Sequence, residues 1–482
     1  MSSARQIQRS SGVGIAVVSL CLVQFVDVLG VTVVVTSLPA MLASLHARES
    51  YASLIATGYA MFFGGLLMLG ARLGDRFGHR RTILVSLMVF ASGAVMGATA
   101  GSTVVLMAAR CLQGAAAAGS VPSALRLLTT MTPDGPIRQR AIAVWSAAGA
   151  AAGASGFVVG GIVTDLTSWR VVFWAFLPLA ATLATAIVWS VPRDHDADPA
   201  KSLNLVGAAT FTAAIMAFVV ATTLITEPAR RVGGELLLAI CAVLAGGFLL
   251  IDRRAAAPLL PTRLLGSARL RQGARGGLLN TATTSSAITL VTLYLQNTLR
   301  RSPLETAAML LPFSLAVIGG ASLSAVLLRR YQPQFVVAFG LAGIAAADLA
   351  LIPSAAVSLV VPVCAVAGGA GIGLSSVATT GLGTDVEAAW RGSASGIINT
   401  TAQLGTAIGT AVLLLVASAT TGLPAAGTPE PAIAWSVAAA VAAAGSGFFA
   451  IAGQRSGRPV RRIARGGQTD AEHQAGAHTL QP

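Results

Sequence analysis

The sequence predicts an all-α membrane protein with about 14 transmembrane helices, and three observations lead to that prediction. Of its 482 residues, 55% are hydrophobic and only 10% are charged, whereas soluble domains carry about 25% charged residues. The mean hydropathy of the chain is +0.76. The apolar residues gather into runs of roughly 20, which is enough to cross a bilayer as a helix.

The apolar runs are separated by short polar or charged segments. The runs that we expect to span the membrane are 13–36, 52–71, 82–100, 103–125, 140–164, 171–191, 204–225, 234–251, 274–297, 304–327, 334–352, 357–380, 393–417 and 431–452. The first run is too long for the apolar core of a signal peptide, so we expect it to be retained. The run at 274–297 is the most polar, and polar residues at membrane depth usually face a cavity or another helix.

The basic residues orient these spans. If the N-terminus is cytoplasmic, 25 of the 32 Lys and Arg residues fall in cytoplasmic segments and six fall in outer loops, while Arg110 lies within a span. This asymmetry follows the positive-inside rule. We therefore expect a multi-pass protein of the cytoplasmic membrane with both termini in the cytoplasm. The net charge of +14 is explained by these loops and does not indicate a nucleic-acid partner.

The residue types that carry enzyme chemistry are scattered. The four cysteines lie far apart inside apolar runs, and the five histidines, at 46, 79, 195, 473 and 478, all lie outside the spans. This spacing indicates neither a disulfide framework nor a metal site. We expect the protein not to be an enzyme, and we expect no cofactor and no metal.

Asp27 and Arg110 are the charged residues that lie furthest inside the predicted spans. Asp27 is about nine residues from the outer end of the first span, and Arg110 is about seven from the outer end of the fourth. At about 1.5 Å per residue their depths differ by only a few ångströms, so they can pair, with Gln113 on the same face as Arg110. A buried carboxylate beside a mobile arginine can take up and release a proton near neutral pH. The alternative is a static ion pair that fixes helix packing.

The segment Gly70–Arg81 is a short charged turn between two apolar runs. Gly74 and Gly78 allow the chain to bend, and the carboxylate of Asp75 lies among arginines. Those arginines are Arg72, Arg76, Arg80 and Arg81. This segment resembles the loop between the second and third helices of the major facilitator superfamily.

Further motifs, in the same order, extend the resemblance. Arg110–Gly114 is similar to the Arg-x-x-Gln-Gly signature of the fourth helix of that family. Gln24–Pro39 resembles the first helix of its 14-helix drug:proton antiporters, with Asp27 three residues earlier than in their pattern. Gly392–Gly405, in the thirteenth span, is also similar to that branch.

Glycines recur at three- and four-residue spacing in the fifth span, at Gly149, Gly153, Gly156, Gly160 and Gly161. Small residues on one face allow helices to approach closely. The stretch from 156 to 161 resembles the antiporter signature Gly-Pro-x-x-Gly-Gly, but Phe157 replaces the proline, so the helix can lack the usual kink. The alternative is a general packing seam.

The resemblance implies a fold of two six-helix bundles with two helices inserted between them. The first bundle would be 1–195, the inserted helices and a cytoplasmic linker 196–273, and the second bundle 274–454. We expect the basic tail 455–482 to be disordered.

The resemblance also implies an inner gate. The thirteenth helix would present its unpaired amides near Ser393, and a helix N-terminus stabilises a nearby carboxylate by about 0.3–1 kcal/mol. We expect Asp75 to lie near 392–395 in the outward-open state, with Gly74, Arg76, Gly78 and Arg80 around it. The alternative is a solvated carboxylate.

We expect a monomeric, proton-coupled exporter of amphipathic drugs or antibiotics that works by alternating access, with protons and the lipid bilayer as its other partners. The alternative is a uniporter or importer of a small metabolite or sugar. Candidate residues of the substrate cavity are Gln113, Asn280, Thr284, Asn399 and Gln403. Asp348, near the outer end of its span, is expected to reach the membrane interface.

Overall fold

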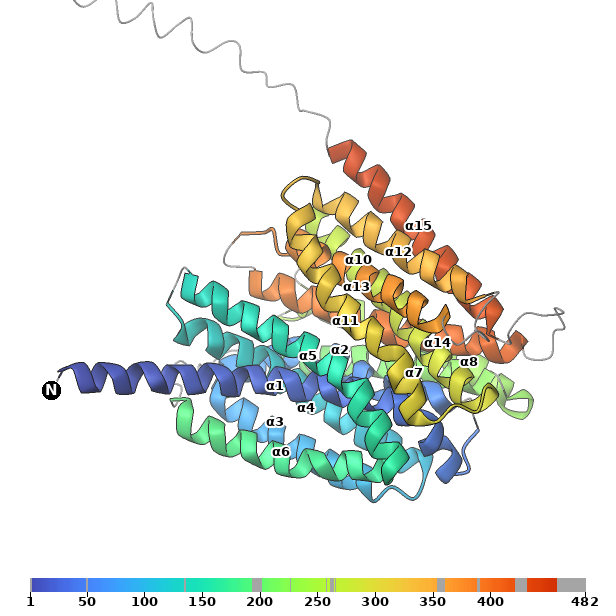
Figure 1. Cartoon of the computed structure of the whole chain (residues 1–482), viewed down its shortest axis with the longest axis horizontal. Helices are drawn as coiled ribbons and strands as arrows, with labels where there is room; N and C mark the ends of the chain where they lie inside the picture. The colour runs from blue at the N-terminus through green and yellow to red at the C-terminus, as the bar shows by residue number, and fades with distance from the viewer. Residues whose placement is uncertain are drawn as a thin grey trace, which may run out of the picture.

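The computed structural model describes residues 2–48, 51–133, 136–192, 202–225, 227–256, 258–260, 264, 266–352, 360–387, 391–420 and 431–456. Within them the chain forms long helices and no strand (Figure 1). The helices are α1 (Ser2–Ser44), α2 (Ala52–Phe77), α3 (His79–Ala98), α4 (Thr103–Met131), α5 (Pro136–Leu166), α6 (Trp169–Ser190), α7 (Leu205–Ile225), η2 (Pro228–Arg230), α8 (Arg231–Arg254), α10 (Ala268–Leu293), η3 (Tyr294–Thr298), α11 (Pro303–Leu327), α12 (Pro333–Leu351), α13 (Val360–Gly383), α14 (Arg391–Thr420) and α15 (Ala432–Ser456).

Thirteen of the described helices are long and apolar enough to cross a membrane. The remaining long helix is α10, which contains the most polar of the predicted spans. Several helices run beyond their apolar stretch, and α1 continues through Pro39 to Ser44. The hydrogen bonds of a helix are made by the backbone and do not require apolar side chains, and α1 continues past Pro39 although that residue has no N–H to donate. The predicted all-α polytopic fold is confirmed.

The helices pack as two similar sets. In the first set, α1 contacts α4, α5 and α6, α2 contacts α4, and α3 contacts α4 and α6. The same pattern recurs in the second set, where α10 contacts α13, α14 and α15, α11 contacts α13, and α12 contacts α13 and α15. Figure 1 shows α1–α6 in blue to green on one side and α11–α15 in yellow to red on the other. We call the two sets the first bundle (α1–α6) and the second bundle (α10–α15).

The two bundles meet along two helix pairs, α2 with α14 and α5 with α11. In the order of the helices, α2 corresponds to α11 and α5 corresponds to α14. The two pairs are therefore equivalent, as expected for two bundles related by an internal pseudo-symmetry. The helices α7 and α8 pack on each other, and α7 also lies against α2 and α14. The inserted pair is therefore attached where the bundles join.

The segment Gly70–Arg81 is mostly helical, which corrects the expectation of a loop. The helix α2 continues to Phe77, and Gly78 alone separates it from α3. Gly78 has a φ of 93°, a conformation that glycine adopts without strain, and its N–H donates to the Gly74 carbonyl at 2.9 Å. A single-residue break forces α2 and α3 to run antiparallel. We call this end of the bundles the Gly78 end, and the opposite end, where α5 turns into α6, the Ser168 end.

The predicted tail 455–482 lies outside the described residues from position 457 onwards. The linker between α8 and α10 is described in part, at 255–256, 258–260, 264 and 266–267.

Candidate functional site

Asp27 lies in the interior of the first bundle, with 5% of its surface exposed. The Ser120 hydroxyl of α4 donates to its Oδ2 at 3.0 Å. The Tyr59 hydroxyl of α2 lies 3.4 Å from Oδ1 and 3.1 Å from the Asp27 backbone carbonyl. An isolated ionised carboxylate is expensive to bury, and here its hydrogen-bond partners are two neutral hydroxyls. Among the described residues the carboxyl group therefore has hydroxyl partners and no cationic one at hydrogen-bond distance.

Arg110 is fully buried on α4. Its Nη1 donates to the carbonyl of Gly30 on α1 at 2.7 Å and to Gln113 Oε1 at 3.2 Å. Its guanidinium lies over the ring of Tyr59, 4.9 Å from the centroid, which is a cation–π geometry. The Nε and Nη2 atoms of Arg110 and the Nε2 atom of Gln113 have no hydrogen-bond partner among the described residues. These buried N–H groups can therefore each donate one further hydrogen bond.

No ion pair joins Asp27 to Arg110 within the described part of the chain. Tyr59 contacts both residues, with its hydroxyl on Asp27 and its ring on Arg110. The sequence identified the two charged residues but not Tyr59, because an aromatic residue in an apolar span is ordinarily core. We call Asp27, Tyr59, Arg110 and Ser120 the buried charge site.

At the Gly78 end, Asp75 is 39% exposed and its Oδ1 lies 3.4 Å from His79 Nε2. The guanidinium of Arg80 donates to the carbonyl of Val188 on α6 at 2.7 Å. Gly74 allows a close approach, because a Cβ there would lie 2.2 Å from His79 Nδ1 and 2.7 Å from Ser123 Oγ. Arg76 lies over the ring of Phe77. The proposed gate partner Ser393 is in the first turn of α14, and its side chain lies outside the described residues.

A buried carboxylate that the sequence did not single out, Asp252, holds the inserted helices and the linker together at the Gly78 end. Asp252, at the end of α8, is buried and accepts hydrogen bonds from Asn204 Nδ2 at 2.8 Å and from the Leu259 and Leu260 amides at 2.6 and 2.9 Å. Arg72 of α2 donates to the carbonyl of Pro258 in the same turn. The only sequence signal was a carboxylate at the end of a span, next to two arginines.

The glycines of α5 do not all face one neighbour. A Cβ at Gly149 would contact Gln24 of α1, a Cβ at Gly156 would lie 1.8 Å from Thr32 Oγ1, and one at Gly160 would lie 2.3 Å from the Val33 carbonyl. Gly161 instead faces α11, where a Cβ would lie 2.5 Å from the Ala307 Cβ. Gly153 has no atom within 4 Å of its Cβ position. The spacing thus serves two interfaces, one inside the first bundle and one between the bundles.

Phe157 lies on the junction between the bundles. It is buried, and its ring meets that of Phe313 on α11 edge to face, with centroids 6.3 Å apart. Nearer the Ser168 end, Gln296 Nε2 of η3 donates to the carbonyl of Thr36 on α1 at 2.9 Å. The bundles are therefore in direct contact at the Ser168 end.

The five candidate cavity residues are distributed over several places. Gln113 belongs to the surroundings of Arg110, and Gln403 of α14 faces α2, where a Cβ added to Gly64 would lie 2.7 Å from its Cβ. Asn280 donates to Ser376 Oγ on α13 at 2.8 Å. Asn399 is exposed, and Thr284 lies inside the second bundle.

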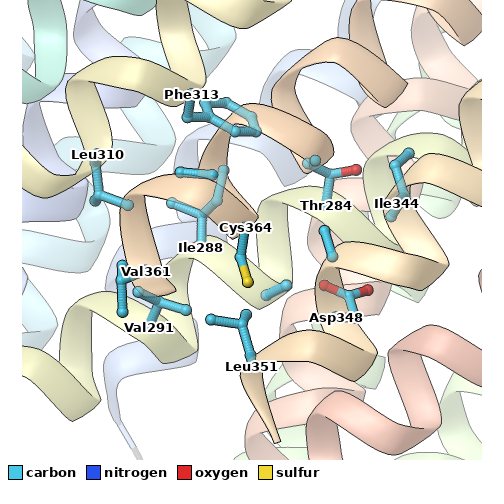
Figure 2. A pocket seen from close by; sticks show the side chains of 14 residues that line it. Thr284, Ile288, Val291, Leu310, Phe313, Ile344, Asp348, Leu351, Val361 and Cys364 are labelled. Atoms are coloured by element: carbon cyan, nitrogen blue, oxygen red, sulfur yellow. The ribbon is translucent and has the colours of Figure 1, made fainter. Parts of the chain in front are cut away.

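The expectation for Asp348 is wrong. Its side chain does not reach the membrane interface, because the residue is only 3% exposed and lines an internal cavity of the second bundle (Figure 2). Its position near the end of α12 gave the depth along the helix, but α10, α11 and α13 cover the face on which it lies.

Two repeated bundles of membrane-length helices with charged residues buried inside them are the architecture of a polytopic membrane transport protein, and the family and named relatives that follow are transport proteins and not enzymes. Residues 20–410 match the Major Facilitator Superfamily, and the chain belongs to that family. The helical two-bundle arrangement is the fold of that family.

The chain is similar to named transport and resistance proteins. It is 32% identical to the cephamycin export protein CmcT of Amycolatopsis lactamdurans, over 88% of this chain and 89% of that protein. It is 31% identical to the lincomycin resistance protein of Streptomyces lincolnensis, over 70% of each chain. A solved structure, the human organic anion transporter MFSD10 (TETRAN), has a similar fold, with a TM-score of 0.60, 17% sequence identity, and coverage of 91% of this chain and 99% of that one.

Proposed function

We propose that this protein exports amphipathic drugs or antibiotics across the cytoplasmic membrane, driven by protons that bind at the buried charge site. The similarity to proteins named for cephamycin export and lincomycin resistance supports the substrate class and the outward direction. The observation that carries the proton coupling is the burial of Asp27 against two neutral hydroxyls, with Arg110 close by but not paired to it.

Proton binding changes the charge of this site from balanced to net positive. When Asp27 is ionised, it accepts from Ser120 and from the Tyr59 hydroxyl, and the charge of Arg110 lies over the ring of the same tyrosine. When Asp27 is protonated, the buried positive charge of Arg110 loses its counter-charge, which favours an arrangement that hydrates or otherwise pairs it. Because Tyr59 touches both groups, the change reaches α1, α2 and α4 together.

Alternating access requires contacts between the bundles to break at one end of the protein while others form at the opposite end. At the Ser168 end the contacts to be broken are the Gln296–Thr36 hydrogen bond and the close packing of Gly161 on α11. The excess of basic residues at the Gly78 end supports a cytoplasmic Gly78 end and cytoplasmic termini. In this proposal the transporter works as a monomer, because the two bundles of one chain provide both sides of the pathway.

The proposed inner gate joins Asp75 of α2 to the first turn of α14. Support comes from the packing one to two turns away, because a Cβ on Gly396 of α14 would lie 2.8 Å from Met68 Sδ of α2. We expect an experimental structure of the outward-open state to place the Asp75 carboxylate at the backbone amides near Ser393. Since a helix dipole acts within about one turn, a separation well over about 10 Å in that state would refute the gate.

Transport into inverted membrane vesicles tests the proposed function. With an acidic lumen, vesicles holding this protein should accumulate a fluorescent amphipathic cation such as ethidium, and an uncoupler should abolish the accumulation. Equilibration of ethidium across the membrane, independent of the proton gradient, would instead indicate a uniporter. Accumulation of ethidium under the reversed proton gradient would indicate an importer. Vesicles without the protein provide the baseline.

A further inference from the structure

The second bundle contains a buried carboxylate that the proposed proton site does not use. Asp348 of α12 lines a cavity of about 40 Å³ enclosed by α10, α11, α12 and α13. Figure 2 shows its carboxylate, in red, on the same side of the cavity as the hydroxyl of Thr284. A cavity of this size has room for water.

Neither polar group is satisfied by the protein. Asp348 Oδ2 and Thr284 Oγ1 are buried and have no hydrogen-bond partner in the described part of the chain. The other residues that line the cavity are mainly apolar, among them Leu310, Phe313 and Val361. A buried carboxylate without partners is stable only when it is neutral or when it gains a compensating ligand.

The donor set decides between the possible ligands. A metal cation needs several oxygen ligands, and this cavity offers one carboxylate and one hydroxyl. The titratable groups nearby are the Cys364 thiol, which lines the cavity from α13, and the Tyr294 phenol of η3 in the same apolar cluster. The lining contributed by α10 and α11 holds no charged group, and the described part of α15 carries its basic residue, Arg455, at its far end. The ligand that fits an apolar cavity with one carboxyl group is a proton.

Asp348 lies among the helices that correspond to those around Asp27, although Asp27 is on the first helix of its repeat and Asp348 is on the third. The buried charge site uses α1, α2 and α4, with α3 alongside, where a Cβ at Gly30 would touch Phe90. The helices around Asp348 are α10, α11, α12 and α13, which occupy the equivalent places in the second bundle. Each bundle therefore holds a buried carboxyl group among the first four helices of its repeat.

We propose that Asp348 is a second proton-binding site, located in the second bundle and separate from Asp27. This inference rests on the proposed proton coupling for its role in transport, but not for the binding of the proton itself. The proton is taken from water admitted to the cavity and is bound by a carboxylate oxygen. Phe313 lines this cavity and also meets Phe157 across the bundle junction. Hydration of the cavity is thereby connected to the packing of α11 against α5.

Infrared difference spectroscopy tests the proposed proton site at Asp348. The sample is the purified full-length protein in detergent, and protons are the only ligand that is varied. Spectra would be compared from about pH 4 to about pH 9, which covers exposed and buried carboxyl groups. We expect the wild-type protein to show carboxylic-acid C=O bands of two buried groups. Asp348→Asn should lose one band, Asp27→Asn should lose the other, and Asp348→Glu should retain a shifted band. Asp385→Asn, which removes an exposed carboxylate paired with Arg269, should leave both bands unchanged.

A spectrum of Asp348→Asn that matches the wild type over this range would overturn the proposal. The result for Asp348→Glu keeps the test valid if the asparagine variant fails to fold. Loss of the Asp348 band together with gradient-independent transport by the wild-type protein would leave the proton site in place and refute the proposed function. An unchanged spectrum of Asp348→Asn together with uncoupler-sensitive efflux by the wild-type protein would refute the second proton site and leave the proposed function in place.

Discussion

Replacing Asp27 by asparagine should reduce proton-driven efflux to the level of cells without the transporter. Asparagine has nearly the same shape. Its one side-chain oxygen can accept from either Ser120 or Tyr59, and its NH2 group can donate to the hydroxyl oxygen of the other. It cannot exchange a proton, so the charge beside Arg110 no longer changes during the cycle. We expect the variant to fold, to bind substrate and to lose the dependence of transport on external pH. Drug accumulation in cells, with and without an uncoupler, measures the effect.

Two neighbouring variants separate proton exchange from positioning. Tyr59→Phe keeps the ring under Arg110 but removes the hydroxyl from Asp27, and Ser120→Ala removes the other donor. Hydrogen bonds to charged groups contribute about 1.5–3 kcal/mol, so each variant should shift the pH range of transport without abolishing it. Uncoupler-sensitive efflux that survives Asp27→Asn would show that the proton binds elsewhere.

Gly156→Ala should destabilise the protein and reduce transport, whereas Gly153→Ala should do neither. A Cβ at Gly156 would lie 1.8 Å from Thr32 Oγ1 and 2.7 Å from Thr32 Cβ, so α5 and α1 would have to separate. Overpacking of this kind costs about 1–3 kcal/mol. Gly153 is three residues away on the same helix and has open space at its Cβ position. Thermal unfolding in detergent, together with efflux, measures the difference.

The partner residue provides a second test of the same contact. Thr32→Ala removes the hydroxyl that the added methyl group meets first, so it should recover part of the stability that Gly156→Ala loses. Because residues in contact are not additive, the double variant should be more stable than the sum of the single changes predicts. Equal effects of Gly153→Ala and Gly156→Ala would contradict this prediction, because alanine raises helix propensity at both positions and only Gly156 faces Thr32.

Much of the fold follows from local properties of the chain. The length of each apolar run predicts a membrane-spanning helix, and Gly78 marks the turn between α2 and α3. The polar character of 274–297 agrees with α10, which among the described long helices is the one not apolar enough to be counted as a candidate span. The limits of the helices were less predictable, because hydrogen bonding carried α2 to Phe77, through a segment that its charges indicated as a loop.

The sequence predicted how deep the residues of the candidate site lie along their helices, but not which neighbours their side chains contact. Sequence position gave Asp27 and Arg110 similar depths, and both are buried in the first bundle. It could not show that Tyr59 lies between them, because Tyr59 is one of many apolar or aromatic residues of α2. For the same reason the sequence could not show that the side chain of Asn280, a candidate residue of the substrate cavity, donates to Ser376 on α13.

The sequence by itself determined the number and order of the long helices, the family, and the burial of Asp27 and Arg110 within their spans, since these depend on hydropathy and on spacing along one helix. Only the tertiary structure decided which neighbour each side chain meets. It enclosed Asp348 among four helices, gave Asp252 three hydrogen-bond donors in the linker region, and turned Gly161 toward α11 and Gly156 toward α1. The physical reason is that position along a helix fixes height, whereas the rotation of the helix and its neighbours are fixed by the packing of all the helices together.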